Sequence, residues 1–148
     1  MNAQSMRTTL GQKVIAVDSA EDLGDVKTYV VSPDVERIEK IQIAGRKKHA
    51  LFTAWRDLAS FGADAVMVTA AEAPAESDDE RDLGAAKGDI ALLDARIVDT
   101  AGFEHGTVSD VTFDADSGSI VSVEGSDGTT YPHDAVASLG SYALVVRA

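Results

Sequence analysis

Cysteine is absent from the 148 residues of this chain, and aromatic residues make up only 5% of it. The absence of cysteine excludes disulfides, thiolate metal ligands and cysteine nucleophiles, and it is typical of proteins from a reducing compartment. No uninterrupted apolar run approaches the ~20 residues that a membrane-spanning helix needs, so we expect no membrane insertion. The N-terminal sequence MNAQSMRTTLGQ lacks the apolar segment of a secretory signal. Together these absences predict a cytoplasmic protein.

Positive charge is also scarce, because 13 Lys and Arg residues face 25 Asp and Glu residues and the net charge is −12. Residues 90–148 alone hold 2 basic against 9 acidic residues, a net charge of −7. An acidic surface repels phosphate backbones, so nucleic acid is an unlikely partner. The chain is 45% hydrophobic, which is enough to form a buried core.

Two segments of the chain, residues 10–70 and 90–148, repeat one pattern of apolar residues and glycines. LGDVKTYVVSPDVERIEKIQI (23–43) matches HGTVSDVTFDADSGSIVSVEG (105–125) at an offset of 82 residues, and LASFGADAVMV (58–68) matches VASLGSYALVV (136–146) at an offset of 78. Apolar positions and glycines agree while polar residues differ, as expected of two diverged copies of one fold. The equivalent pairs include Gly24 and Gly106, Val26 and Val108, Val31 and Phe113, Ile38 and Ile120, Ile41 and Val123, and Gly62 and Gly140.

Each copy is predicted to consist of short strands joined by tight turns. The sequences SPDVE (32–36) and DADSG (114–118) have the composition of hairpin tips. In the strand that follows each tip the apolar phase flips, since Ile38 is out of phase with Ile41, and such a flip predicts a β-bulge or a strong bend. Helix is expected only as short turns near residues 54–60 and 134–138, ending at the two equivalent glycines.

The remaining segments are assigned no strand. Residues 1–9 are predicted to be an N-terminal tail, and residues 71–89 an acidic linker between the copies. The linker is either solvated or partly helical, with ERDLGAAK (80–87) as its one helix-like stretch.

The order of these elements resembles the PRC-barrel family. The clearest residues are RIVDTAGFEHGTVSDVTFDADSGSIVSV (96–123) and SLGSYALVV (138–146), whereas the first copy lacks the D-x-x-x-D run at its tip and is interrupted there by Pro33. The resemblance implies an all-β fold of two tandem, small, strongly bent PRC-type β-barrels with short helical turns. Family members occur in the photosynthetic reaction-centre H subunit and in the C-terminal domain of the bacterial ribosome maturation factor. They dock on other proteins and on each other, and the family has no shared catalytic residue to carry over.

No metal or cofactor site is predicted. The histidines His49, His105 and His133 occupy non-equivalent places in the two copies and show no ligand spacing. Asp114 and Asp116 sit at the first and third positions of a calcium loop, but Gly118 falls one position early and Gly125 stands where the bidentate glutamate belongs.

The candidate partner-binding residues fall in three places. The only basic cluster is Arg46, Lys47, Lys48 and His49. Trp55, the sole tryptophan, either fills the core or the cleft between the copies, or it is an exposed anchor for a partner. Phe103 and Tyr142 have no aromatic counterpart in the first copy and are weaker candidates of the same kind.

The predicted function is a non-enzymatic adaptor or scaffold that binds a protein partner or a second copy of itself through the barrel faces. The alternative is a ribosome-maturation-like accessory factor acting near rRNA and ribosomal proteins, against which the net charge counts. An enzyme with an unrecognised site is the third hypothesis.

Overall fold

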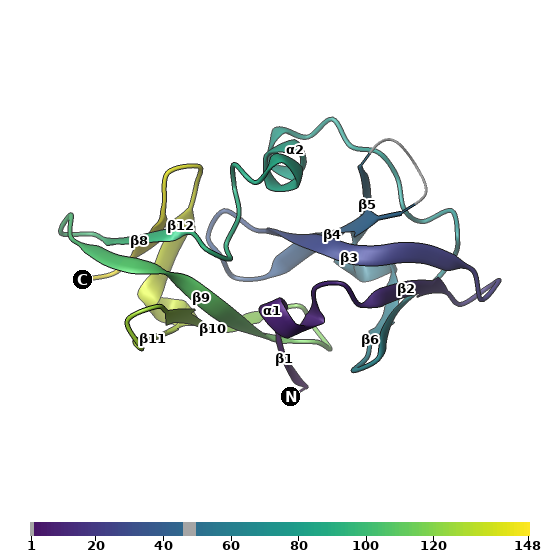
Figure 1. The fold of residues 1–148 in the computed structure, drawn as a ribbon, viewed down its shortest axis with the longest axis horizontal. Coiled ribbons are helices and arrows are strands. Elements are labelled where there is room, and N and C mark those ends of the chain that lie inside the picture. The colour runs from purple at the N-terminus through teal and green to yellow at the C-terminus, as the bar shows by residue number, and fades with distance from the viewer. Residues whose placement is uncertain (1, 46–49) are drawn as a thin grey trace.

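The computed structural model describes residues 2–45 and 50–148, which are built mostly of β-strands in two mixed sheets (Figure 1). The first sheet contains β2 (Lys13–Ala16), β3 (Asp22–Val31), β4 (Ile38–Ala44), β5 (Leu51–Ala54), β6 (Leu58–Phe61) and β7 (Ala65–Val68). The second contains β1 (Ala3–Ser5), β8 (Arg96–Asp99), β9 (Glu104–Asp114), β10 (Ile120–Gly125), β11 (Thr130–Pro132), β12 (Val136–Leu139) and β13 (Leu144–Val146). We call residues 10–70 unit 1 and residues 90–148 unit 2.

The two sheets have the same order of strands. It is β5-β4-β3-β2-β7-β6 in unit 1 and β11-β10-β9-β8-β13-β12 in unit 2, with β1 added beside β9. In each sheet one pair, β2 with β7 or β8 with β13, is parallel, and the other neighbours are antiparallel. The repeated order of elements that the sequence predicts is therefore present in the structure.

The predicted bulges are confirmed at equivalent places. In unit 1 the register shifts between Val30, opposite Lys40, and Val31, opposite Ile38. In unit 2 it shifts at the corresponding point, between Ile120 and Ser122. The extra residue lets both Ile38 and Ile41 point into the core, where their exposed fractions are 1% and 0%.

The two hairpin tips meet at the junction between the units. The Ile38 amide donates to the Gly118 carbonyl at 2.8 Å, and the Ile120 amide donates to the Glu36 carbonyl at 2.9 Å. Arg37 and Ser119 form an antiparallel bridge between these two bonds. Every partner in this set is related to another by the offset of 82 residues, so the units meet around an approximate twofold axis.

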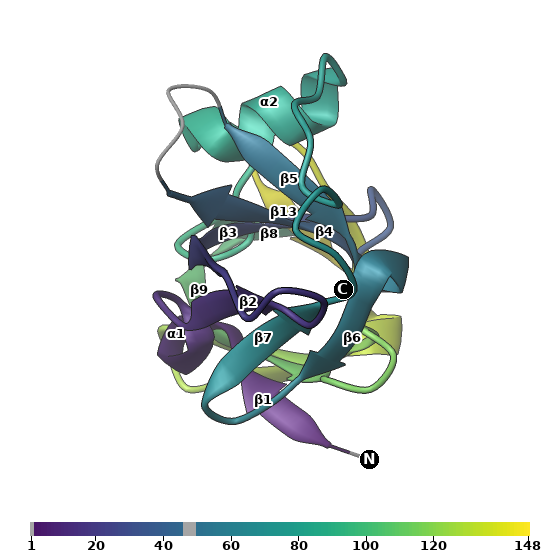
Figure 2. The same ribbon diagram turned by 90° about the vertical axis from the view of Figure 1, so that its right-hand side faces the viewer.

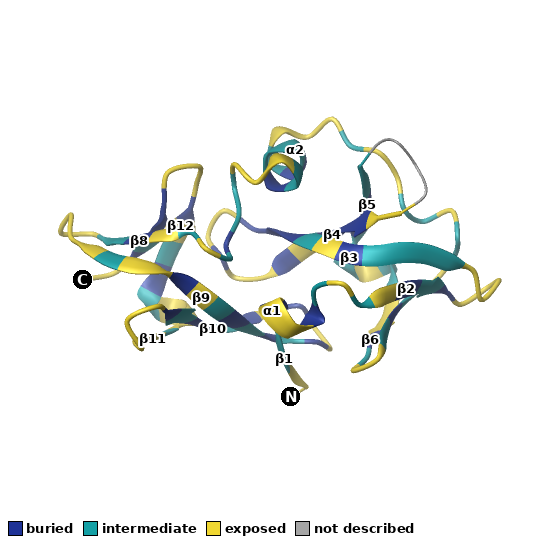
Figure 3. Cartoon of the chain, in the orientation of Figure 1, coloured by how far each residue is buried: buried dark blue, intermediate teal, exposed yellow. Residues whose placement is uncertain are grey.

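One continuous hydrophobic core joins the units through these tips. The buried stretches of β3, β4, β9 and β10 lie toward the middle of the molecule, while the loops at both ends are exposed (Figure 3). Phe113 of unit 2 is fully buried, with its ring centroid 5.3 Å from that of Phe61 and 5.7 Å from that of Tyr29 in unit 1. Val35, at the tip of the first hairpin, is 0% exposed although its φ is +59°, so its burial offsets a backbone conformation that is unfavourable for a β-branched residue.

The expected helical turns are shorter than predicted. They are the 3₁₀ turns η1 (Trp55–Asp57) and η2 (His133–Ala135), and each runs directly into a strand, β6 or β12. Gly62 and Gly140 therefore end strands rather than helices. Each is followed by a tight turn in which its amide donates to the carbonyl three residues on.

Of the two alternatives for the linker of residues 71–89, solvated or partly helical, the structure has the partly helical one. Its residues Glu80–Lys87 form helix α2, with Asp79 accepting from the amides of Arg81 and Asp82 as N-cap and Gly88 at φ +83° as C-cap. Ala85 is 4% exposed and packs with Val30 and Phe52 on the outer face of unit 1. In Figures 1 and 2 the helix covers one side of the molecule, opposite the N-terminus.

The predicted N-terminal tail is also folded. Residues Ala3–Ser5 pair with β9, and helix α1 (Met6–Thr9) follows with Met6 1% exposed in the core. The Ser5 hydroxyl donates to Asp110 at 2.6 Å in unit 2, while Thr9 is hydrogen-bonded to the Tyr29 hydroxyl in unit 1. The segment thus crosses from one unit to the other. None of the helices within residues 2–45 and 50–148 is long and apolar enough to span a membrane.

Candidate functional site

Trp55 lies in the cleft between the units. Its ring stacks on Phe61 at 5.5 Å between centroids and meets the edge of Phe113 at 6.1 Å. Gly118 at the tip of the second hairpin lies so close that an added Cβ would stand 2.9 Å from the indole. Trp55 is half-buried in this cleft. Its exposed rim lines a groove together with the cations Arg37, Lys40 and Arg56.

Phe103 projects into solvent from the loop between β8 and β9, with 67% of its surface exposed. The Asp99 carboxylate holds this loop, since it accepts hydrogen bonds from the amides of Ala101 at 2.8 Å and Phe103 at 3.1 Å. The same carboxylate lies 2.7 Å from Nε2 of His105. These bonds, the one from His105 foremost, hold the pKa of the Asp99 carboxyl below its ordinary value. Phe103 is therefore displayed on an ordered loop.

Tyr142 is the second exposed aromatic of unit 2, with 70% of its surface exposed. The Arg96 guanidinium lies over its ring, 4.5 Å from the centroid. Arg96 also forms an ion pair with Glu104, Nε to Oε1 3.5 Å, and Glu104 directly follows Phe103. Arg96, the first residue of the four-residue strand β8, therefore links Tyr142 to Glu104, the residue next to Phe103. We call these four side chains, Arg96, Phe103, Glu104 and Tyr142, the β8 face.

The tip DADSG is a hairpin turn, as predicted. Asp114 accepts from the Asp116 amide at 3.0 Å and from the Ser117 hydroxyl at 3.1 Å, and Gly118 has a φ of +79°. The carboxylate is thus occupied by the chain's own donors. Within residues 2–45 and 50–148 no group of three or more His, Asp and Glu side chains is arranged to hold a metal ion.

The remaining sequence candidates do not converge on one place. The basic cluster Arg46, Lys47, Lys48 and His49 lies outside the described residues. His133 is exposed at the start of η2, the position that Trp55 has in η1.

Two arginine side chains that anchor the segments outside the units were not predicted from the sequence. In α2 the Arg81 guanidinium donates to the carbonyl oxygens of Val31 at 2.9 Å in unit 1 and Leu139 at 3.0 Å in unit 2. In the N-terminal segment Arg7 donates to the Ser109 carbonyl at 2.7 Å and pairs with Asp94 at 2.9 Å. Arg7 lies in the segment predicted to be a tail, and Arg81 lies in the segment predicted to be a linker. Only the helix-like sequence ERDLGAAK indicates that the segment around Arg81 is structured.

No protein-family model matches this chain, and no curated protein matches it.

Proposed function

We propose that this protein is a non-enzymatic docking protein made of two small barrels of the PRC-barrel kind, and that the β8 face of unit 2 binds a protein partner. The observation that carries this proposal is the display of Phe103 and Tyr142. Among the described residues, three large hydrophobic side chains have more than half of their surface exposed. Phe103 and Tyr142 are two of the three.

The path of the chain supports the barrel part of the proposal. In unit 2, β11, η2 and β12 follow one another directly, while β11 pairs with β10 at one end of the strand path and β12 pairs with β13 at the other. One bent segment therefore occupies both ends of the path; the path itself is open, and this connection between its ends is what supports a barrel-like curvature. The segment from β5 through η1 to β6 does the same in unit 1.

The chemistry of the β8 face supports a protein as its partner. Aromatic and arginine side chains are enriched at the centres of protein interfaces, and aromatic rings bury a large area at a small cost in conformational entropy. The surrounding unit carries a net charge of −7, so a complementary partner presents an apolar pocket rimmed by Lys or Arg.

The experiment compares partner capture by matched variants. The wild-type chain, the double variant Phe103→Ser/Tyr142→Ser and the control Val17→Ser, which removes the exposed hydrophobic residue of unit 1, are used as baits in lysate from the source cells. A protein retained by wild type and Val17→Ser but lost from the double variant supports the proposal. Equal retention by all three contradicts it, and nuclease-sensitive retention of ribosomal subunits favours the accessory-factor alternative.

A further inference from the structure

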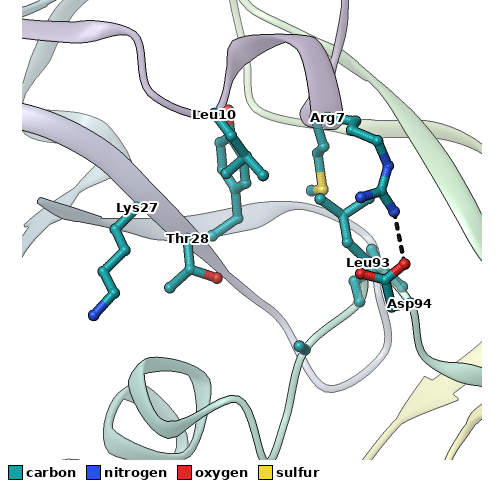
Figure 4. Close-up of a pocket in the computed structure, with 10 residues that line it drawn as sticks. Arg7, Leu10, Lys27, Thr28, Leu93 and Asp94 are labelled. Atoms are coloured by element: carbon teal, nitrogen blue, oxygen red, sulfur yellow. Dashed lines mark hydrogen bonds and ion pairs between the residues drawn. The ribbon is translucent and has the colours of Figure 1, made fainter. Parts of the chain in front are cut away.

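A cavity of about 180 Å³ lies where α1, β3 and residues 91–94 meet (Figure 4). Residues 91–94 belong to the start of unit 2, just after α2, and α1 belongs to the segment that crosses between the units. The cavity is therefore bounded by chain segments that hold the units together. Its wall consists of Met6, Arg7, Leu10, Lys27, Thr28, Tyr29 and residues 91–94.

One part of this wall is apolar. Leu92 is 3% exposed and belongs to the shared core, against which Leu10 and Leu93 also pack. The hydroxyl of Tyr29 is already hydrogen-bonded to Thr9. The interior of the cavity thus offers hydrocarbon surface to an occupant.

The other part of the wall is polar and has unused donors. The register of β3 against β4 shifts between Val26 and Thr28, so Lys27 is a bulged residue and both Lys27 and Thr28 line the cavity. Within the described part of the chain, neither the Lys27 ammonium nor the Thr28 hydroxyl has a hydrogen-bond or ion-pair partner.

Arg7 stands on the opposite side of the space from Thr28, beside Asp94 and Leu93 (Figure 4). The bonds to Ser109 and Asp94 use two of the five N–H donors of its guanidinium. The charges of Arg7 and Asp94 cancel, so the ammonium group of Lys27 makes the net charge of the cavity wall positive. The chain as a whole has a net charge of −12.

We propose that this cavity binds a small amphipathic carboxylate, whose hydrocarbon chain lies against Leu10, Leu92 and Leu93 and whose carboxylate faces Lys27 and Thr28. Engineered apolar cavities of ~150 Å³ accept benzene, so the volume here suits a chain of about six carbons. The inference goes beyond docking through the β8 face, because it assigns a ligand to a different part of the molecule. A ligand bound here contacts the crossing segment and both units, and it stabilises their association by mass action.

The test is a titration of the ¹⁵N-labelled full-length chain, followed by amide chemical shifts, with hexanoate, hexan-1-ol and hexylamine as probes. Hexanoate is expected to saturate the shifts of Thr28 and Leu93 with a Kd of about 1 mM, given its few non-hydrogen atoms. Hexan-1-ol binds about two- to fivefold more weakly, because the exposed ion pair with Lys27 is lost, and hexylamine binds more weakly still.

Two variants and one control complete the test. Lys27→Gln weakens hexanoate binding about two- to fivefold and leaves hexan-1-ol unchanged, whereas Lys87→Gln, an exposed cation outside the cavity, changes neither. Ala91→Leu fills the cavity and abolishes the binding of both probes. The absence of saturable shifts, equal affinities for the three probes, or hexanoate binding unchanged by Lys27→Gln overturns the proposal.

Discussion

Gly118 shows how one residue fixes the contact between the units. Its φ is +79°, and a Cβ there would stand 2.9 Å from the Trp55 ring, whereas Gly128, with a φ of +89°, has no atom within 4 Å of such a Cβ. Gly128→Ala is expected to lower the free energy of unfolding by about 1–2 kcal/mol, through backbone strain alone. Gly118→Ala adds the overlap with the indole, so a loss of about 3 kcal/mol is expected in urea unfolding. Equal losses for the two variants contradict the placement of Trp55 against this tip.

Asp99 provides a prediction for the pH dependence of stability. Because the hydrogen bonds from His105 and from the Phe103 and Ala101 amides lower the pKa of its carboxyl in the folded state, the ionised form stabilises the fold. This contribution is fully present above the ordinary pKa of 3.8 and is lost as the pH falls through the lower pKa of the folded state. Urea midpoints measured from pH 5 to pH 2.5 should therefore fall less steeply for Asp99→Asn than for wild type. Parallel curves for the two proteins contradict the prediction.

At the scale of elements, α2 is held on unit 1 by a buried carboxylate. Asp82 is 3% exposed, and it accepts from the Lys40 ammonium at 2.5 Å and from the Ser77 hydroxyl at 2.6 Å. Lys40→Met leaves this carboxylate with one side-chain donor fewer. The expected loss of unfolding free energy is about 2 kcal/mol, below the usual cost of breaking a fully buried pair because Lys40 is one-third exposed.

The matched control is Lys13→Met, which removes an exposed cation paired with Asp22 and Asp25. Its expected effect on the free energy of unfolding is smaller than that of Lys40→Met, because solvent screens an exposed ion pair. Trypsin should cut after Arg81 and Lys87 faster in Lys40→Met than in wild type, and at an unchanged rate in Lys13→Met. Rapid cleavage there in the wild-type chain would show that α2 is not docked.

The elements that the sequence predicts well are those specified by local pattern. The bulge before Ile41 follows from a flip in apolar phase, and the tip at Asp114 follows from turn-forming residues, so both were foreseeable. The helix α2 was underpredicted because its stabilising partners are remote in sequence: Ala85 packs on Val30 and Phe52, and Arg81 bonds to carbonyl oxygens of both units. The crossing of the N-terminal segment depends in the same way on remote contacts: Ser5 bonds to Asp110, 105 residues away, and Met6 is buried in the shared core.

At the scale of the whole molecule, the duplication was visible in the sequence but the way in which the copies meet was not. Phe113 and Val35 fit the apolar pattern of a unit's own interior, and nothing local distinguishes a side chain that packs within a unit from one that packs across the junction. The β8 face was foreseen only as two unmatched aromatics, Phe103 and Tyr142. The contact of Tyr142 with Arg96 follows from the parallel pairing of β8 with β13, which the sequence does not show.

The central claim is that the two units form one body around their paired hairpin tips, and native-state hydrogen exchange at four amides tests it most directly. The amides of Ile38 and Ile120 bond across the junction, and those of Val26 and Val108 are equivalent amides that bond within their own units. We predict that all four exchange only through global unfolding, with free energies that agree within about 1 kcal/mol. The contradicting result is exchange at Ile38 and Ile120 at least tenfold faster than at Val26 and Val108, which corresponds to a free energy of opening lower by about 1.4 kcal/mol or more. It would show that the units separate without unfolding.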